Sequence, residues 1–295
     1  MSEYVYFPGC SQKATARGYE ESLLAIAPRL GLSLKELPDW SCCGTCMVLS
    51  VNKVLSLSLA ARNLALAEPL GKNVVTPCPS CNLTLSKTNQ VLDEGGELAD
   101  KVKSCLTAGS LSYGGGVRVR HLLDVIVNDV GVERLRSEAK SPLKGRRVAP
   151  YYGCQVVRPH AEGDNAEDPQ NLEKVIVALG GEPADFPLKT ACCGGSLAVT
   201  RPDAGAEMCR DILKNIKAAR AGLIVTPCPL CQVTLEMAQR QDQAELGDEA
   251  LVPILNLAQL IGLAMGLSLK ELGITRALMP KVMRTALAAR DSQAA

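Results

Sequence analysis

Short apolar runs rich in β-branched residues alternate with longer segments along the whole chain. The short runs have the length and composition of buried strands, and they cover residues 5–7, 73–77, 148–152 and 222–227. The longer segments carry apolar residues at helical spacing, and they cover residues 19–30, 52–67, 172–179 and 204–221. Each half of the chain is therefore predicted to run β-α-β-α-β. Residues 117–127 and 252–263 add a fourth strand and helix to each half.

This alternation predicts the α/β class, because strands joined through helices form parallel sheets with right-handed crossovers. We expect two tandem pseudo-symmetric, Rossmann-like domains, each with a parallel sheet of about four strands flanked by helices. The predicted boundaries are residues 1–140 and 141–295. Residues 83–147 are predicted to be the tail of the first half plus a linker, with the glycine run at 114–116 as a turn.

Charge and hydropathy exclude several classes of partner. The 295 residues include 32 basic and 31 acidic side chains, so no net field attracts nucleic acid or anionic lipid. The longest apolar stretch, residues 251–269, is interrupted by Pro253, Asn256 and Gln259 and is predicted to be a buried strand and helix, not a membrane span. No secretory signal is recognisable, and 13 cysteines without one predict a reducing, cytoplasmic location.

Ten of the cysteines form one five-cysteine pattern written twice. Each copy reads single Cys, then Cys-Cys-Gly, then Cys-Pro-x-Cys. The two copies are Cys10, Cys42, Cys43, Cys78 and Cys81, and then Cys154, Cys192, Cys193, Cys228 and Cys231. Every group follows a predicted strand, and the carboxyl ends of parallel strands share one edge of a sheet. The sequence therefore predicts two equivalent sites, each collecting five thiols.

Five thiols per site favour an iron–sulfur cluster. Four cysteines would complete a tetrahedral zinc site, although thiolates suit both zinc and iron–sulfur clusters, and a plain dithiol site also stays open. The ferredoxin run C-x2-C-x2-C-x3-C is missing, so an unusual cluster is expected. Gly44 and Gly194 are expected to let the backbone pass close to a bulky inorganic ligand. The prolines at 77, 79, 227 and 229 are expected to end the strands and hold the Cys-x-x-Cys loops open.

Several of these runs resemble the catalytic B subunit of heterodisulfide reductases. The resemblance is carried by residues 6–10, 40–44, 77–81, 151–155, 158–159 and 192–195 and extends from Tyr4 to about Gly273. It implies two CCG-type domains, each holding a non-cubane [4Fe–4S] cluster through all five of its cysteines. It further implies that the two clusters face each other across a cleft, in which they reduce a disulfide or form one in the reverse reaction.

The chain has no flavin or nicotinamide fingerprint, so electrons are expected to come from other subunits. By resemblance these are the iron–sulfur protein known as the C subunit, together with the flavin-containing A subunit. The substrate is a disulfide or protein-bound sulfur, and a lipoate-bearing carrier protein is a further candidate partner. An alternative is an electron-relay subunit of a glycolate- or lactate-type oxidoreductase complex. A zinc-stabilised assembly subunit is the third hypothesis.

The remaining candidates receive structural predictions. Cys46, Cys105 and Cys209 are predicted to be spare buried thiols, the last two on helices and without partners. His121 aligns with Asn256 and is predicted to cap a helix or lie in the core, and His160 is predicted to lie in an exposed loop. The predicted surface residues are Lys13, Lys189 and the acidic loop 162–168. Thr45 stands where the second half has Gly195, a difference that could alter the first site.

Overall fold

The protein contains two four-stranded parallel sheets, as seen in a computed structural model that describes residues 2–45, 47–140, 143–159, 164–246, 251–278 and 280. The first sheet has the order β2-β1-β3-β4, built from β1 (Ser2–Tyr6), β2 (Leu32–Glu36), β3 (Val74–Thr76) and β4 (Val119–His121). The second repeats it as β6-β5-β7-β8, built from β5 (Arg147–Pro150), β6 (Glu182–Pro183), β7 (Leu223–Thr226) and β8 (Ile254–Asn256). All six strand pairings are parallel, which confirms the predicted fold class.

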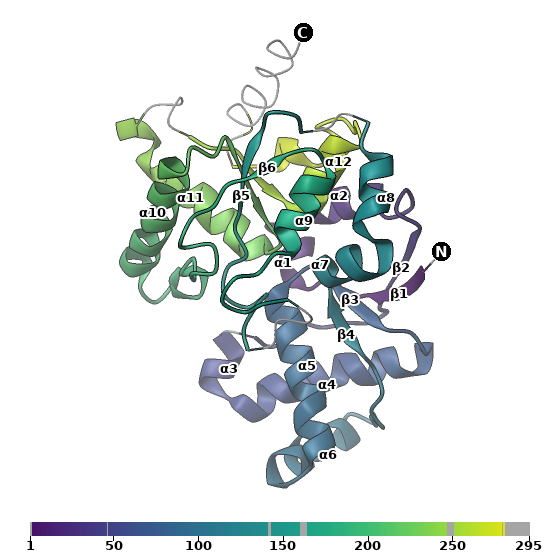
Figure 1. Ribbon diagram of the computed structural model, residues 1–295. Coiled ribbons are helices and arrows are strands. Elements are labelled where there is room, and N and C mark those ends of the chain that lie inside the picture. The colour runs from purple at the N-terminus through teal and green to yellow at the C-terminus, as the bar shows by residue number, and fades with distance from the viewer. Residues whose placement is uncertain are drawn as a thin grey trace.

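Helices connect the strands and flank both sheets (Figure 1). Those of the first half are α1 (Cys10–Lys13), α2 (Arg17–Ile26), α3 (Met47–Val51), α4 (Lys53–Ala67), α5 (Pro79–Glu94), α6 (Glu97–Ala108), α7 (Leu122–Val125) and α8 (Val132–Glu138). Those of the second half are α9 (Asn171–Ala178), α10 (Pro202–Ala218), α11 (Pro229–Leu246) and α12 (Leu257–Ala264). The four helices predicted from periodicity correspond to α2, α4, α9 and α10.

The predicted tail and linker at residues 83–147 is more regular than expected. It contains most of α5, then α6, β4, α7 and α8, of which β4 and α7 match the fourth strand and helix predicted at residues 117–127. Helix α6 packs on α4 and α5, and its buried Val102 and Leu106 join a separate apolar cluster with Leu57 and Leu92. The glycine run 114–116 lies outside helices and strands, as predicted for a turn.

The helix that follows the last strand of each sheet is capped at its N-terminus by the residue that ends that strand. The His121 ring accepts a hydrogen bond from the Leu123 N–H, and the Asn256 side chain accepts one from the Gln259 N–H in a full capping box. Both capping residues are buried. The predicted capping or core role of His121 is therefore confirmed, because this side chain does both.

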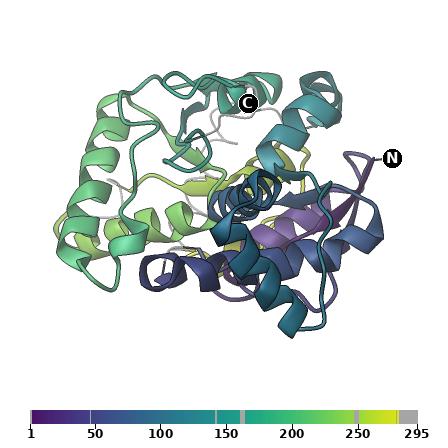
Figure 2. The same ribbon diagram turned by 90° about the horizontal axis from the view of Figure 1, so that it is seen from below.

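The two halves share a hydrophobic core in addition to the apolar clusters within each half. Helices from the end of each half pack against a helix near the start of the other: α12 lies on α2, and α7 and α8 lie on α9. The first of these contacts can be followed in Figure 1, and Figure 2 shows the purple-to-blue first half beside the green-to-yellow second half. Leu23 and Ile26 of α2 belong to the same buried cluster as Leu257 and Ile261 of α12. The boundary between residues 140 and 141 stays a prediction.

Residues 251–269 form β8 and α12 in this core, as predicted. None of the helices in the described ranges combines the length and apolar character that crossing a bilayer needs.

A tight approach between the halves gives a stability prediction. A Cβ atom at Gly18, in α2, would stand 2.7 Å from the backbone oxygen of Gly273. An exposed helical glycine gains about 0.5–1 kcal/mol on replacement by alanine. At Gly18 the sign should reverse, with Gly18→Ala costing about 1–3 kcal/mol through overpacking. Urea unfolding followed by circular dichroism measures this change in the free energy of unfolding.

The neighbouring Arg17→Ala is the matched control, because Arg17 is exposed on the same helix and its loss should change the free energy of unfolding by about 0.5 kcal/mol or less. An unfolding midpoint for Gly18→Ala equal to or above that of the wild type would contradict the interlocked interface.

Candidate functional site

Each five-cysteine set gathers at the carboxyl edge of its own sheet. In the first half the three groups follow β1, β2 and β3, and in the second they follow β5, β6 and β7. The sulfur atoms of Cys10 and Cys42 lie 4.0 Å apart, and those of Cys43 and Cys81 lie 3.4 Å apart. In the second set the sulfur atoms of Cys193 and Cys231 lie 3.3 Å apart. The predicted convergence of distant cysteines is therefore observed in both halves.

The two sets also share a pattern of burial. The Cys-Pro-x-Cys pair and the second cysteine of the Cys-Cys-Gly group are buried in each half. The other two cysteines face outward: Cys10 and Cys42 are exposed, and Cys154 and Cys192 are half-buried. Each site thus has a closed inner side and an open outer side, with the first site the more open of the two.

Glycines allow the sulfur atoms to approach the backbone before each single cysteine. A Cβ atom at Gly9 would stand 2.8 Å from the sulfur of Cys81, and one at Gly153 would stand 3.0 Å from the sulfur of Cys231. Both glycines have positive φ, which favours glycine. Gly44 and Gly194 lie against helix backbone: a Cβ would stand 3.0 Å from the Ser56 Cα and 2.7 Å from the Gly205 Cα. The close passage of their backbone by an inorganic ligand stays a prediction.

The Cys-Cys-Gly loop of the first half is held by side chains of α4. The Asn63 amide accepts a hydrogen bond from the Ser41 N–H at 2.9 Å and donates one to the Ser41 carbonyl at 3.0 Å. The Ser56 hydroxyl donates to the Gly44 carbonyl at 2.8 Å. Sequence reasoning missed both side chains, because nothing in the spacing of a helical asparagine or serine indicates which loop it will reach.

The second half holds its Cys-Cys-Gly loop differently. The Tyr151 hydroxyl donates to the Ala191 carbonyl at 2.8 Å, and the Cys209 thiol donates to the Cys193 carbonyl at 3.0 Å. Cys209 is buried as predicted, but the prediction that it has no partner is wrong. Phe7 occupies the position equivalent to Tyr151 and instead packs edge-on against Trp40. The two sites are therefore similar in cysteines and different in their supports.

Thiols in contact with one another have strongly shifted pKa values. The hydrogen bond with Cys10 lowers the pKa of Cys42 to about 2, and the one with Cys154 lowers the pKa of Cys192 likewise to about 2. The same hydrogen bonds, followed by burial, raise the pKa values of Cys10 and Cys154. Stabilised thiolates beside thiols suit the binding of a soft metal. Within the described ranges no three His, Cys, Asp or Glu side chains surround a point as a single metal ion requires.

The two sites lie next to each other across the junction of the halves. Ser80, in the Cys-Pro-x-Cys loop of the first half, donates a hydrogen bond to Gln155 beside Cys154. A small cavity of about 50 Å³ is lined by Pro79 and Ser80 together with cysteines of the second set. The hydroxyl of the fully buried Tyr19 donates a hydrogen bond to the carbonyl of Pro227 at 3.2 Å. Burial, and then charge on Cys228 and Cys78, raises the pKa of Tyr19.

His121 supports the same junction through the Cys-Pro-x-Cys loop of the first half. Its Nε2 lies 3.3 Å from the carbonyl of Pro77, the residue before Cys78. Burial lowers the pKa of His121 to about 4, so the ring is neutral near pH 7. A neutral ring serves here as a hydrogen-bonding support for the loop.

Lys189 is buried, so the prediction of a surface lysine is wrong. It lies 2.6 Å from Asp168 and 2.9 Å from Glu173, and it also donates to the Pro169 carbonyl. Its own carbonyl accepts hydrogen bonds from the N–H groups of Tyr152 and Gly153. The ion pairs therefore anchor the turn that presents Cys154.

The other candidates lie away from this junction or outside the described residues. Lys13 is partly exposed and pairs with Glu20 and Glu36, in agreement with a surface role. Cys105 is exposed on α6, which corrects the prediction of burial. In the acidic loop, Asp164 accepts hydrogen bonds from the N–H groups at the start of α9. Cys46, His160 and Glu162 fall outside the described residues.

Comparisons with known proteins show the family of the chain. The model of the CCG cysteine-rich domain family matches residues 4–86 and 148–236. The 8-methylmenaquinol:fumarate reductase membrane anchor subunit of Wolinella succinogenes is 37% identical over 93% of this chain and 96% of its own. The B subunit of the ferredoxin/F420H2-dependent CoB-CoM heterodisulfide reductase of Methanosarcina acetivorans is 31% identical over 93% of each chain.

A crystal structure of a hypothetical protein from Helicobacter pylori has the same fold, with a TM-score of 0.72 at 17% identity over 92% of this chain and 51% of that one. The chain belongs to the family of duplicated CCG cysteine-rich domain proteins that includes the B subunits of heterodisulfide reductases.

Proposed function

We propose that each half holds a non-cubane [4Fe–4S] cluster through its five cysteines and that the protein converts a disulfide, or a related sulfur substrate, by two electrons between the two sites. One observation carries this proposal. Two equivalent five-thiol sets lie side by side, with Ser80 of one bonded to Gln155 of the other. Cleaving a disulfide leaves two sulfur atoms, and two neighbouring sites could bind one each.

The residues present fit such a cofactor. Each site supplies five soft donors, more than one tetrahedral zinc ion uses. Gln12, two residues after Cys10, is fully buried, and neither atom of its amide is paired within the described part of the chain. When bound, each cluster would supply one electron to the reaction.

The protein's own side chains would then position the sulfur substrate. The outward-facing cysteines of both sets leave the outer side of each site open to it. Ser80 and Gln155 line the small cavity between the sites and are polar groups that could orient it. Tyr19 and His121 exclude water from the base of the sites, since both are buried and bonded to the carbonyls that precede Cys228 and Cys78.

A second candidate is an electron relay without disulfide chemistry. It is favoured by the 37% identity to a membrane anchor subunit of a quinol:fumarate reductase over nearly the whole of both chains. In that role the paired sites would pass electrons between a quinol and a partner protein. The same cysteine geometry serves both functions, so only a reaction test separates them.

Partner proteins follow from either role. For the disulfide reaction we propose an iron–sulfur partner of the C subunit type, together with a flavin-containing partner of the A subunit type. The similarity to B subunits supports both. A lipoate carrier as substrate and a cytoplasmic location stay predictions from sequence.

Substitution of single cysteines tests the ligand sets. Cys81→Ala should strip or distort the first centre and leave the second, and Cys231→Ala should do the reverse. Each variant should lose up to half of about eight iron atoms per chain, because each cluster holds four. Iron and acid-labile sulfide assays with electron paramagnetic resonance measure this. Cys105→Ser is the matched control, since Cys105 is exposed on α6 and should leave both centres intact.

Native iron content and spectra in both Cys81→Ala and Cys231→Ala would overturn the five-cysteine ligand sets. Zinc in place of iron in the wild type would favour the structural alternative.

A reaction test separates the two functions. Anaerobic wild-type protein, mixed with thiols and oxidised, should give a paramagnetic signal that changes with the identity of the thiol, because substrate sulfur would bind at the open side of a centre. With a reduced viologen as electron donor it should also cleave a matching disulfide. Spectra indifferent to thiols, with no cleavage of any disulfide in a panel, would contradict the disulfide function and leave the relay.

A further inference from the structure

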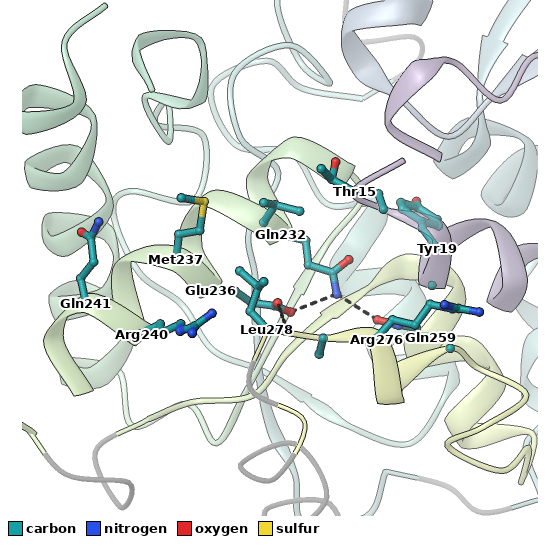
Figure 3. Close-up of a pocket in the computed structure, with 15 residues that line it drawn as sticks. Thr15, Tyr19, Gln232, Glu236, Met237, Arg240, Gln241, Gln259, Arg276 and Leu278 are labelled. Carbon is teal, nitrogen blue, oxygen red and sulfur yellow. Dashed lines mark hydrogen bonds between the residues drawn. The ribbon is translucent and has the colours of Figure 1, made fainter. Parts of the chain in front are cut away.

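A second, larger cavity lies along the junction, lined by a different set of residues from the small cavity between the sites. It has a volume of about 560 Å³, within the range of about 300–1,000 Å³ typical of small-molecule sites. Figure 3 shows that Thr15 and Tyr19 from the first half line one side, while Met237, Arg240 and Gln241 of α11 line the other. The cavity therefore opens where the two halves meet.

A buried acid lies in its wall. Glu236 is only 4% exposed, and one carboxyl oxygen accepts a hydrogen bond from the Leu278 N–H at 2.9 Å. The other oxygen is bound loosely, 3.5 Å from the Gln232 side-chain nitrogen (Figure 3). Burial raises the pKa of Glu236 to about 7, so much of it carries a proton near neutral pH and can donate a hydrogen bond.

Buried amides connect this acid to the cysteine sites. The Gln232 amide, adjacent in sequence to Cys231, donates to Gln259 at 3.0 Å and accepts from Asn256 at 3.2 Å. Across the cavity, Thr15 and Tyr19 follow Cys10 closely in the chain, and the Tyr19 hydroxyl reaches the loop of Cys228. The cavity is thus bordered by segments that directly follow cysteines of both sets.

The charges around the cavity select a neutral ligand. An anion would have to enter beside the buried Glu236 carboxyl, and the ionised form of that group would repel it. A cation would meet Arg240 and Arg276, of which Arg276 is paired with Glu21 at 2.7 Å. The apolar surface of Ala16, Val233, Met237 and Leu278 suits a hydrocarbon ring, and the acid and amides suit a carbonyl oxygen.

We propose that this cavity is a binding site for a quinone, with Glu236 donating a hydrogen bond to one ring carbonyl and the Ala16, Val233 and Met237 side chains packing on the ring. A quinone is neutral, planar and accepts hydrogen bonds, and it exchanges electrons with redox centres, which the neighbouring cysteine sets would provide. In that last respect the inference rests on the proposed function. It extends the electron-relay role, which already involves a quinol, by naming the site and the residues that would bind the ring.

Binding of duroquinone tests the site directly. This quinone has a methyl group at every free ring position, so it does not add to thiols. Anaerobic equilibrium dialysis of wild-type protein should show saturable binding of about one molecule per chain. Glu236→Leu should weaken it about tenfold, the equivalent of one buried hydrogen bond. Glu236→Gln keeps a donor and should stay within about threefold, and Ala277→Trp should abolish binding by filling the cavity.

Ser86→Leu is the matched control, because Ser86 holds the position in α5 that Glu236 holds in α11, counted from the Cys-Pro-x-Cys pairs. It should bind like the wild type. Pentamethylbenzoate, an anion of similar shape, should bind at least tenfold more weakly than duroquinone. Iron, sulfide and circular dichroism measured on each variant show whether it is folded and loaded.

Wild-type protein that keeps its clusters but shows no saturable binding would overturn the quinone site and leave the proposed function untouched. The site would also be overturned if Glu236→Leu and Ala277→Trp, both folded, bound duroquinone as tightly as the wild type does. Binding of pentamethylbenzoate as tight as that of duroquinone would overturn it as well. Saturable binding of duroquinone by wild-type protein that contains no iron would contradict the cluster proposal and support the quinone site.

Discussion

The reciprocal packing of helices across the two halves is the contact on which the arrangement of the sites depends. Helices from the end of each half cover a helix near the start of the other, α12 on α2 and α7 with α8 on α9, and their apolar faces form one buried cluster. This packing fixes the angle between two sheets that are not paired with each other. Because the cysteines lie at the sheet edges beside the junction, the same contact brings the thiol sets side by side and closes the base between them with Tyr19 and His121.

Duplication supplied two similar sites, and divergence changed what supports them. The Cys-Cys-Gly loop is clamped by an asparagine and a serine in the first half and by a tyrosine and a cysteine in the second. The first site is more open, whereas the turn of Cys154 is anchored through buried Lys189. Hydrogen bonds and solvent exposure tune the potentials of iron–sulfur clusters. Two centres with the same ligands can therefore have different potentials, which either proposed role would use.

The alternation of strands and helices, the four strands per half and the convergence of the cysteines followed from the sequence. Period and β-branched composition are local signals, and parallel sheets leave one place for residues that follow successive strands. The capping role of His121 was predictable from its alignment with Asn256. The burial of Lys189 and the partner of Cys209 were not. Burial of this lysine depends on Asp168 and Glu173, well before it in the chain, folding onto it, and the partner of Cys209 is a carbonyl that no side-chain pattern reveals.

The sequence by itself determined the fold class, the duplication and the residues gathered at each sheet edge, since these depend on periodicity and order along the chain. Tertiary structure alone decided how the halves dock, which thiols face outward and where a cavity opens. Those features depend on contacts between distant segments, such as Gly18 against Gly273 or Glu236 with Leu278. Such contacts leave no local pattern, because each partner is an ordinary helix or loop residue until distant segments of the chain pack together.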